Sequence, residues 1–165
     1  VLFVSSHQYP YYPGTGAAND IGQGAGTGFT LNLPLSAGAT DADYELAFMR
    51  LALPVVRQFR PELVLVSAGF DAHMDDPLAG MRLTSAYFGR LMGAIADVAD
   101  ATAQGRLVAV TEGGYDLVGL ATSLRASISA LTGEKTSNDA PEGPTPRGDA
   151  TIKAVAPHVS KYWKL

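Results

Sequence analysis

The sequence predicts an α/β fold in which helices cover a parallel sheet, and two observations support this. Short apolar runs of strand length alternate with longer stretches in which apolar residues recur at helical spacing, which is the order of βαβ units. The runs at 63–70 and 107–112 each open with at least four consecutive apolar residues, as is typical of parallel strands buried on both faces. These two runs are therefore expected in the interior.

Taken in order, strands are predicted at 1–6, 29–35, 63–70 and 107–112. The helices predicted between them are 41–59, capped by Thr40 or Asp41, 84–103, and 117–131, which stops before Gly133. Residues 1–133 form the body of the domain, and the polar, Pro- and Gly-rich stretch 134–149 is expected to be a loop or linker. A last helix over 150–165 should pack on the same domain through Ile152, Val155 and Trp163.

The first residue is Val rather than Met, and the chain enters directly on a strand-like run. We therefore expect the sequence to begin in the middle of a domain rather than at a processed N-terminus.

Composition excludes several classes of partner and site. The 165 residues include 47% hydrophobic and 17% charged residues, which is typical of a globular protein. The net charge is −4 and no basic cluster is present, so direct binding to nucleic acid or to an anionic membrane is not expected. There is no Cys, which excludes disulfides and thiolate metal sites and fits a reducing compartment, so that we expect a cytoplasmic protein.

In open parallel sheets, ligands bind beyond the carboxyl ends of the strands. Polar and small residues follow the third strand in "GFDAHMDDPLAGM". Asp71 comes directly after the strand, where it could bind a metal, act as a base or cap a loop. His73 could join it as a second ligand, since residues i and i+2 of an extended segment share a face. Asp75 and Asp76 precede Pro77 and favour a turn.

Two further strand ends carry candidate residues. In "EGGYDL", Gly113 and Gly114 allow close approach of the backbone to a ligand, and Tyr115 could donate a hydrogen bond to an oxyanion or simply pack in the core. In "HQYPYYPGTG", Tyr11 and Tyr12 could line an apolar channel or close a surface loop on themselves. The run "GQGAGTG" leads into a strand and lacks Gly-Lys-Ser/Thr, so it is not a phosphate-binding loop.

Four stretches, "VSSHQYPYYPGTG", "GFTLNLPL", "VLVSAGFDAHMDDPLAGMRLT" and "EGGYDL", occur in the order found in the histone deacetylase superfamily. Over residues 1–133 the chain resembles the carboxy-terminal part of such a catalytic domain, in the style of class II and bacterial members. The resemblance implies a three-layer α/β/α fold of the arginase-deacetylase type. It also implies hydrolysis of an N-acetyl-lysine-type amide by zinc-activated water.

The same resemblance implies a role for individual residues. Asp71 matches a zinc ligand, and Tyr115 matches the Tyr that polarises the acetyl carbonyl. His73 matches no ligand position. The resemblance also implies that the substrate is contacted along the acyl-lysine tunnel by Tyr11, Tyr12, Leu78, Gly113 and Gly114. It further implies a monovalent-cation site for K⁺ at Ser5 and Ser6.

The remaining zinc ligands of the family come from an upstream Asp-x-His segment, and the general base from a His-His pair. The histidines of this chain, His7, His73 and His158, have neither context. We therefore expect an enzyme in the parent protein and no activity in this chain alone. Leu78 is apolar where polyamine-selective relatives can carry an acidic residue, which favours acetylated lysine over an acetylated polyamine as substrate. A non-catalytic acyl-lysine-binding or assembly module is the alternative of another class.

Overall fold

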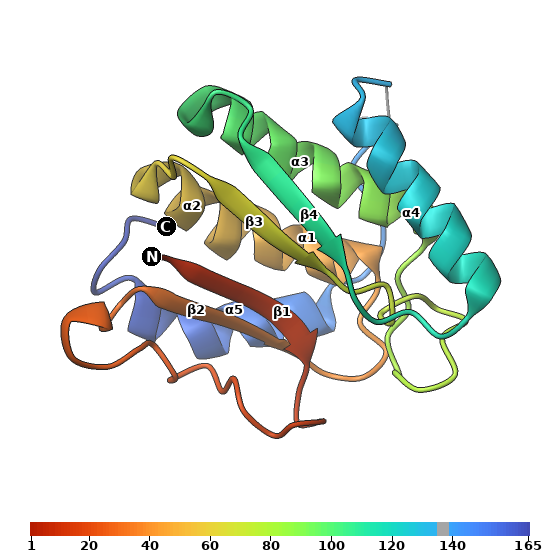
Figure 1. Ribbon diagram of the computed structural model, residues 1–165. Coiled ribbons are helices and arrows are strands. Elements are labelled where there is room, and N and C mark those ends of the chain that lie inside the picture. Colours follow the sequence, from red (N-terminus) through yellow and green to blue (C-terminus); the bar gives the residue numbers. More distant parts are fainter. Residues whose placement is uncertain (135–138) are drawn as a thin grey trace. The chain divides into compact units, whose positions relative to one another are not determined.

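The computed structural model describes residues 1–134 and 139–165. They form two compact units, one of Val1–Phe59 with Pro141–Leu165 and one of Arg60–Ala140. We call these the terminal unit and the central unit and describe each by itself. The elements of both are labelled in Figure 1.

The central unit consists of β3 (Val64–Ala68), α3 (Ser85–Ala103), β4 (Leu107–Thr111) and α4 (Leu117–Leu131). The two strands pair in parallel, with Val64 opposite Leu107 and Ala68 opposite Thr111. Because the strands are parallel, the loops that follow them, 69–84 and 112–116, begin at the same edge of this sheet. The α/β alternation predicted from the sequence is confirmed here, and the strands lie within one to two residues of their predicted limits.

Small residues let the two helices of the central unit approach closely. The buried positions of α4 are Gly119, Ser123 and Ser127, spaced four residues apart on one face. On α3, a Cβ at Gly89 would lie 2.9 Å from the carbonyl oxygen of Ala126, so glycine is needed where the two backbones meet. Figure 1 shows α4 lying against α3.

The expectation that the third and fourth strands are covered on both faces is wrong for this chain. Burial alternates along β3, and β4 is mostly exposed. Leu65, Val108 and Val110 are each at least half exposed to solvent. Such apolar side chains are normally covered by other parts of a protein, and the described residues do not cover them.

The terminal unit contains β1 (Phe3–Gln8), a short 3-10 turn (Gly24–Gly26), β2 (Thr30–Leu35), α1 (Asp41–Ala47), a π turn η2 (Phe48–Ala52), α2 (Leu53–Phe59) and α5 (Pro146–Val159). β1 and β2 also pair in parallel, with Phe3 opposite Thr30. The core of this unit includes Leu31, Leu33, Leu35, Val55 and Val155.

The helix predicted over 41–59 is interrupted by the π turn at 48–52. Pro54 has no N–H to donate to the carbonyl of Arg50, four residues earlier, so the regular hydrogen-bond ladder cannot pass this point. A Pro in the first turn of α2 is compatible with helix initiation there.

The carboxy-terminal helix begins at Pro146, earlier than the predicted start at 150, so the last part of the expected 134–149 loop is helical. Residues 135–138 of that stretch lie outside the described part of the chain. Val155 is buried as predicted, whereas Ile152 is half-buried. Trp163 follows the helix, packs edge-to-face on Phe29 at 5.5 Å and donates its indole N–H to Gly28 O at 2.7 Å.

Asp43 fixes the start of α5 against α1 inside the terminal unit. Its side chain is fully buried. One carboxylate oxygen accepts the backbone N–H groups of Arg147 at 2.9 Å and Gly148 at 2.8 Å, and the other accepts the N–H and hydroxyl of Thr40. One carboxylate thus satisfies the first N–H groups of two helices. None of the helices in the described residues is long and apolar enough to span a membrane.

Candidate active site

The loop after β3, residues 69–84, is closed on itself by backbone pairing. Met74 donates its N–H to Leu83 O at 2.9 Å, and Leu83 donates to Ala72 O at 3.0 Å. The ring of Phe70, which is buried, packs against Phe88 of α3 at 5.2 Å. Because these contacts hold both ends of the loop, the polar residues between them are carried on a fixed frame.

Asp71 leaves this frame directly after Phe70 and lies against the loop that follows β4. A Cβ at Gly113 would lie 3.0 Å from Oδ2 of Asp71, and one at Gly69 would lie 3.2 Å from Oδ1. Phe70 also donates its N–H to Gly113 O at 2.7 Å. The absence of a side chain at both glycines therefore lets two backbone segments pass next to the Asp71 carboxylate.

The pKa of Asp71 is raised above its ordinary value. Burial is the main cause, and the negative charges of Asp76 and Glu112 add to it, while backbone N–H groups of Asp71 and Ala72 act in the opposite direction. A carboxylate in such a negative environment is stabilised by a nearby cation. These surroundings suit the prediction that Asp71 is a ligand of a metal cation.

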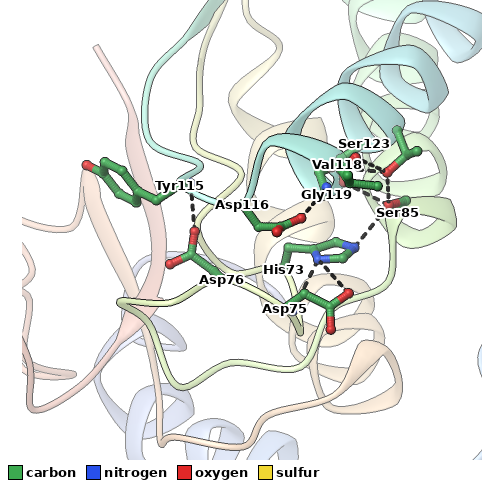
Figure 2. Close-up of polar contacts among 10 residues, drawn as sticks. His73, Asp75, Asp76, Ser85, Tyr115, Asp116, Val118, Gly119 and Ser123 are labelled. Carbon is green, nitrogen blue, oxygen red and sulfur yellow. Dashed lines mark hydrogen bonds and ion pairs between the residues drawn. The ribbon is translucent and has the colours of Figure 1, made fainter.

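Asp76 joins the two loops at this edge. Its Oδ1 accepts the N–H groups of Leu78 at 2.9 Å and Ala79 at 3.1 Å. Its Oδ2 accepts the N–H of Tyr115 at 2.8 Å, and Figure 2 shows this bond. Burial by itself would raise the pKa of Asp76, but these N–H groups and that of Asp116 hold it below the ordinary value. Asp76 is therefore held as a carboxylate bonded to both loops.

Tyr115 is placed by its backbone rather than by packing of its ring. Its side chain is 56% exposed, and in Figure 2 the ring points away from Asp116 and His73. The preceding Gly114 has φ of +140°, and a Cβ there would lie 3.0 Å from Cβ of Phe70. This turn directs the phenol to the outside of the central unit, so the interpretation of Tyr115 as a core residue is wrong.

His73 lies in a hydrogen-bond chain between the loop and the helices. Nδ1 accepts the N–H of Asp75 at 3.2 Å, which assigns the proton to Nε2, and Nε2 donates to Ser85 Oγ at 3.0 Å. Ser85 then donates to Thr122 Oγ1 at 2.7 Å, because the Thr122 hydroxyl donates to Val118 O. Figure 2 shows this chain running into the start of α4.

A hydrogen-bonded Ser, His and Asp can form a nucleophilic triad, in which the His accepts the Ser proton. The hydrogen bonds of Ser85, His73 and Asp75 have the opposite donors and acceptors. The protonated Nε2 cannot accept the Ser85 proton. The Asp75 carboxylate lies 3.7 Å from Nδ1, the nitrogen that already accepts a backbone N–H. The buried ring also stacks on Phe88 at 6.5 Å. These contacts indicate a structural His73.

Within residues 1–134 and 139–165, no three His, Cys, Asp or Glu side chains are close enough together to hold a metal ion. A catalytic zinc ion needs three protein ligands with one open position. The described residues therefore do not fit a complete zinc centre. Asp71 fits the role of one ligand, since its carboxylate is partly buried and its surroundings favour a cation.

The remaining predicted residues are distributed over both units. Leu78 is exposed on the same loop as Asp71, next to the Asp76 turn. Tyr11 and Tyr12 belong to the terminal unit, and Tyr12 is 91% exposed, so the Tyr12 ring does not close the loop. Their role along a substrate channel stays a prediction.

Ser5 and Ser6 lie on β1, opposite Asn32 and Leu33 of β2. The Ser5 hydroxyl donates to Nδ1 of His7 at 3.0 Å, since Nε2 of His7 donates to Gly16 O at 2.9 Å. The K⁺ site predicted at these serines stays a prediction.

Sequence reasoning assigned Asp76 only to a turn. The turn is present, but the bond from Oδ2 of Asp76 to Tyr115 spans 39 residues, and no local pattern predicts it. The sequence offered one indication of a further role: two aspartates precede Pro77, although one is enough for a turn. The need for glycine at position 119 was missed as well. The imidazole of His73 fills the space that a Cβ at Gly119 would occupy, and no local pattern predicts this distant contact.

Three comparisons with known proteins bear on this geometry. The family described as "Histone deacetylase domain" matches residues 1–131. "Histone deacetylase 10, chloroplastic" of Oryza sativa subsp. japonica is 44% identical over 81% of this chain and 30% of its own length. "Probable deacetylase" of Archaeoglobus fulgidus is 35% identical over 99% of this chain and 50% of its own length.

The solved structure of the histone deacetylase Clr3 superposes with a TM-score of 0.90 at 37% identity, covering 99% of this chain and 28% of that chain. This likeness confirms the α/β fold class expected from the sequence. The chain spans 30% to 50% of the length of the two curated relatives. Asp71, Asp76 and Tyr115 all fall within the residues that the family matches.

Proposed function

Since this chain belongs to the histone deacetylase domain family, we propose that its parent protein is a zinc-dependent amidohydrolase that removes acetyl groups from N-acetyl-lysine-type side chains. The reaction adds water across the amide, so that the C–N bond breaks and acetate and the free amine are released. We further propose that this chain supplies part of the active site and is inactive alone.

One observation carries this proposal. The Asp71 carboxylate lies against Gly113, where a Cβ would be 3.0 Å from Oδ2, and Tyr115 follows two residues later with its phenol on the outside of the unit. A carboxylate and a phenol at one edge of a parallel pair of strands are the groups that amide hydrolysis by this family requires. Both lie within the matched region.

In this proposal Tyr115 donates its phenolic hydrogen bond to the acetyl oxygen. Negative charge develops on that oxygen when water attacks the carbonyl carbon, so the hydrogen bond is stronger in the transition state than in the substrate. An exposed phenol is suited to this, because a substrate can reach its hydroxyl.

We propose zinc as the metal of the parent protein, with Asp71 as one ligand and the others supplied by residues that this chain does not contain. A carboxylate oxygen is a ligand that zinc accepts. We also propose that Tyr11, Tyr12, Leu78, Gly113 and Gly114 contact the substrate, and that Ser5 and Ser6 hold K⁺. A cytoplasmic location is proposed from the lack of Cys in this part of the sequence.

The test is to measure acetate release by the full-length parent protein from an acetyl-lysine peptide and from acetylputrescine. We expect hydrolysis of the peptide that a chelator abolishes and added zinc restores. Asp71→Asn should abolish activity, whereas Asp97→Asn, on the exposed side of α3, should leave it unchanged. No acetate from either substrate would refute the proposed function. Faster turnover of acetylputrescine would assign the protein to the acetylpolyamine amidohydrolases instead.

A further inference from the structure

The Asp76 side chain makes more contacts than its turn requires. It is 8% exposed, in contrast to its neighbour Asp75, whose side chain is 67% exposed. The turn at Leu78 and Ala79 is satisfied by Oδ1 alone. The second oxygen is directed across to the loop after β4, where it accepts the N–H of Tyr115 at 2.8 Å.

Every partner of the Asp76 carboxylate is a backbone N–H donor. Both oxygens must therefore accept, which a carboxylate can do and a side-chain amide cannot. Burying a carboxylate is costly unless such donors surround it.

The bond to Asp76 restrains Tyr115 directly, whereas the nearest other restraints act on its neighbours: Gly113 O accepts the N–H of Phe70, and Asp116 caps α4. The ring of Tyr115 is more than half exposed, and this residue follows two glycines whose backbone is permissive. The hydrogen bond to Asp76 fixes the backbone from which the phenol projects. At the other end of the same carboxylate, the N–H of Leu78 fixes a residue on the outside of the loop.

We propose that Asp76 is a positioning residue that couples the two loops of the active site. It holds the Tyr115 phenol within hydrogen-bond reach of the acetyl oxygen, and it holds Leu78 at the rim of the substrate entrance. The inference rests on the function proposed above. It assigns to the same carboxylate the alignment of a catalytic group and the shape of the entrance.

The first test is Asp76→Asn in the full-length parent protein. The remaining side-chain oxygen can still accept from Leu78 and Ala79, but the amide NH₂ faces the Tyr115 N–H and cannot accept it. A displaced catalytic group costs rate rather than binding, so we expect kcat to fall by about 10²-fold and KM to change much less. Asp75→Asn is the matched control and should keep both constants, because the Asp75 side chain is exposed.

The second test separates positioning from a general structural role. In a Tyr115→Phe background the phenolic hydroxyl is gone, so Asp76→Asn should cause little further loss of kcat if it acts through that hydroxyl. Multiplicative losses in the double variant would overturn the proposal. If Asp76→Asn unfolds at the assay temperature, Asp76→Glu, which keeps two acceptor oxygens at a longer reach, replaces it in the same cycle with the same expectation.

Failure of the two proposals can be told apart. A wild-type parent that releases no acetate refutes the proposed function and this inference with it. An active wild type in which Asp76→Asn keeps its kcat refutes the role of Asp76 alone.

Discussion

A methyl group on Gly113 would stand 3.0 Å from Oδ2 and 3.1 Å from Cγ of Asp71. The backbone after β4 therefore passes so close to this carboxylate that no larger residue fits without moving it. This contact ties the residue proposed to bind the metal to the loop that carries Tyr115.

Gly113→Ala is expected to reduce deacetylation by the parent protein more than tenfold. The added methyl pushes the Asp71 carboxylate aside, and overpacking of this kind typically costs about 1–3 kcal/mol of stability. The measurements are kcat, bound zinc and melting temperature. Gly26→Ala is the control, because a Cβ there meets nothing within 4 Å. Normal activity and metal content in Gly113→Ala would contradict the close contact.

Tyr115→Phe is expected to lower kcat by about 10²–10³-fold, the usual cost of removing one oxyanion donor. The melting temperature should stay nearly unchanged, since the side chain is more than half exposed. Tyr162→Phe removes a phenolic hydroxyl from another exposed Tyr and should leave kcat unaffected. Equal rates for both variants would remove Tyr115 from the proposed mechanism.

The depressed pKa of Asp76 predicts a loss of stability in acid. Because its folded-state pKa lies below the ordinary value of about 3.9, its contribution is complete above that value and is lost as the pH falls through the folded-state pKa. The difference in melting temperature between wild type and Asp76→Asn should therefore be constant from pH 7 to about pH 5 and shrink in more acidic buffer. A difference that grows in acid would show that the sign is wrong.

Gly119→Ala is expected to destabilise the protein by about 1–3 kcal/mol. A Cβ at this position would lie 2.7 Å from Nδ1 of His73 and 3.1 Å from Oδ1 of Asp116, the N-cap of α4. Chemical denaturation of the parent protein measures the loss. Ala121→Leu, on the exposed side of α4, should change stability by less than about 0.5 kcal/mol. A stable Gly119→Ala variant would mean that His73 can vacate this space at little cost.

Asp43→Ala is expected to cost about 2–5 kcal/mol, because the N–H groups of Arg147 and Gly148 lose a buried charged acceptor at once. Denaturation is again the measurement. Asp97→Ala, at an exposed position of α3, is the matched substitution and should have little effect. A small effect at Asp43 would mean that water satisfies the start of α5 in the variant.

Much of the fold could be predicted because it follows from local patterns. Apolar spacing identified the helices at 84–103 and 117–131 within a residue of α3 and α4. The interruption at 48–52 was missed, since the helical pattern of apolar residues continues through it and only Pro54 marks it. The apolar side chains of Leu65 and Val108 predict that β3 and β4 need cover, but their composition alone does not say whether the described residues supply it, and they do not.

At the candidate site, the strand-end rule and the resemblance named Asp71 and Tyr115 as candidates, and their roles stay predictions, but neither indicated which contacts hold them. The bonds of Asp76 to Tyr115 and of Asp43 to Arg147 join residues far apart in sequence. An aspartate beside a proline or in the first turn of a helix has an adequate local explanation, so its distant partner leaves no trace in the pattern. Contacts of this kind have to be read from the structure.

The row of solvent-facing aliphatic side chains on β3 and β4 will govern how this polypeptide behaves in the test tube. Surfaces of that kind adsorb to hydrophobic resins, bind reporter dyes and bring copies together as concentration rises. A preparation of these 165 residues should therefore be handled dilute and with a mild detergent, and its sedimentation should shift to smaller particles when Leu65 and Val110 are replaced by Thr.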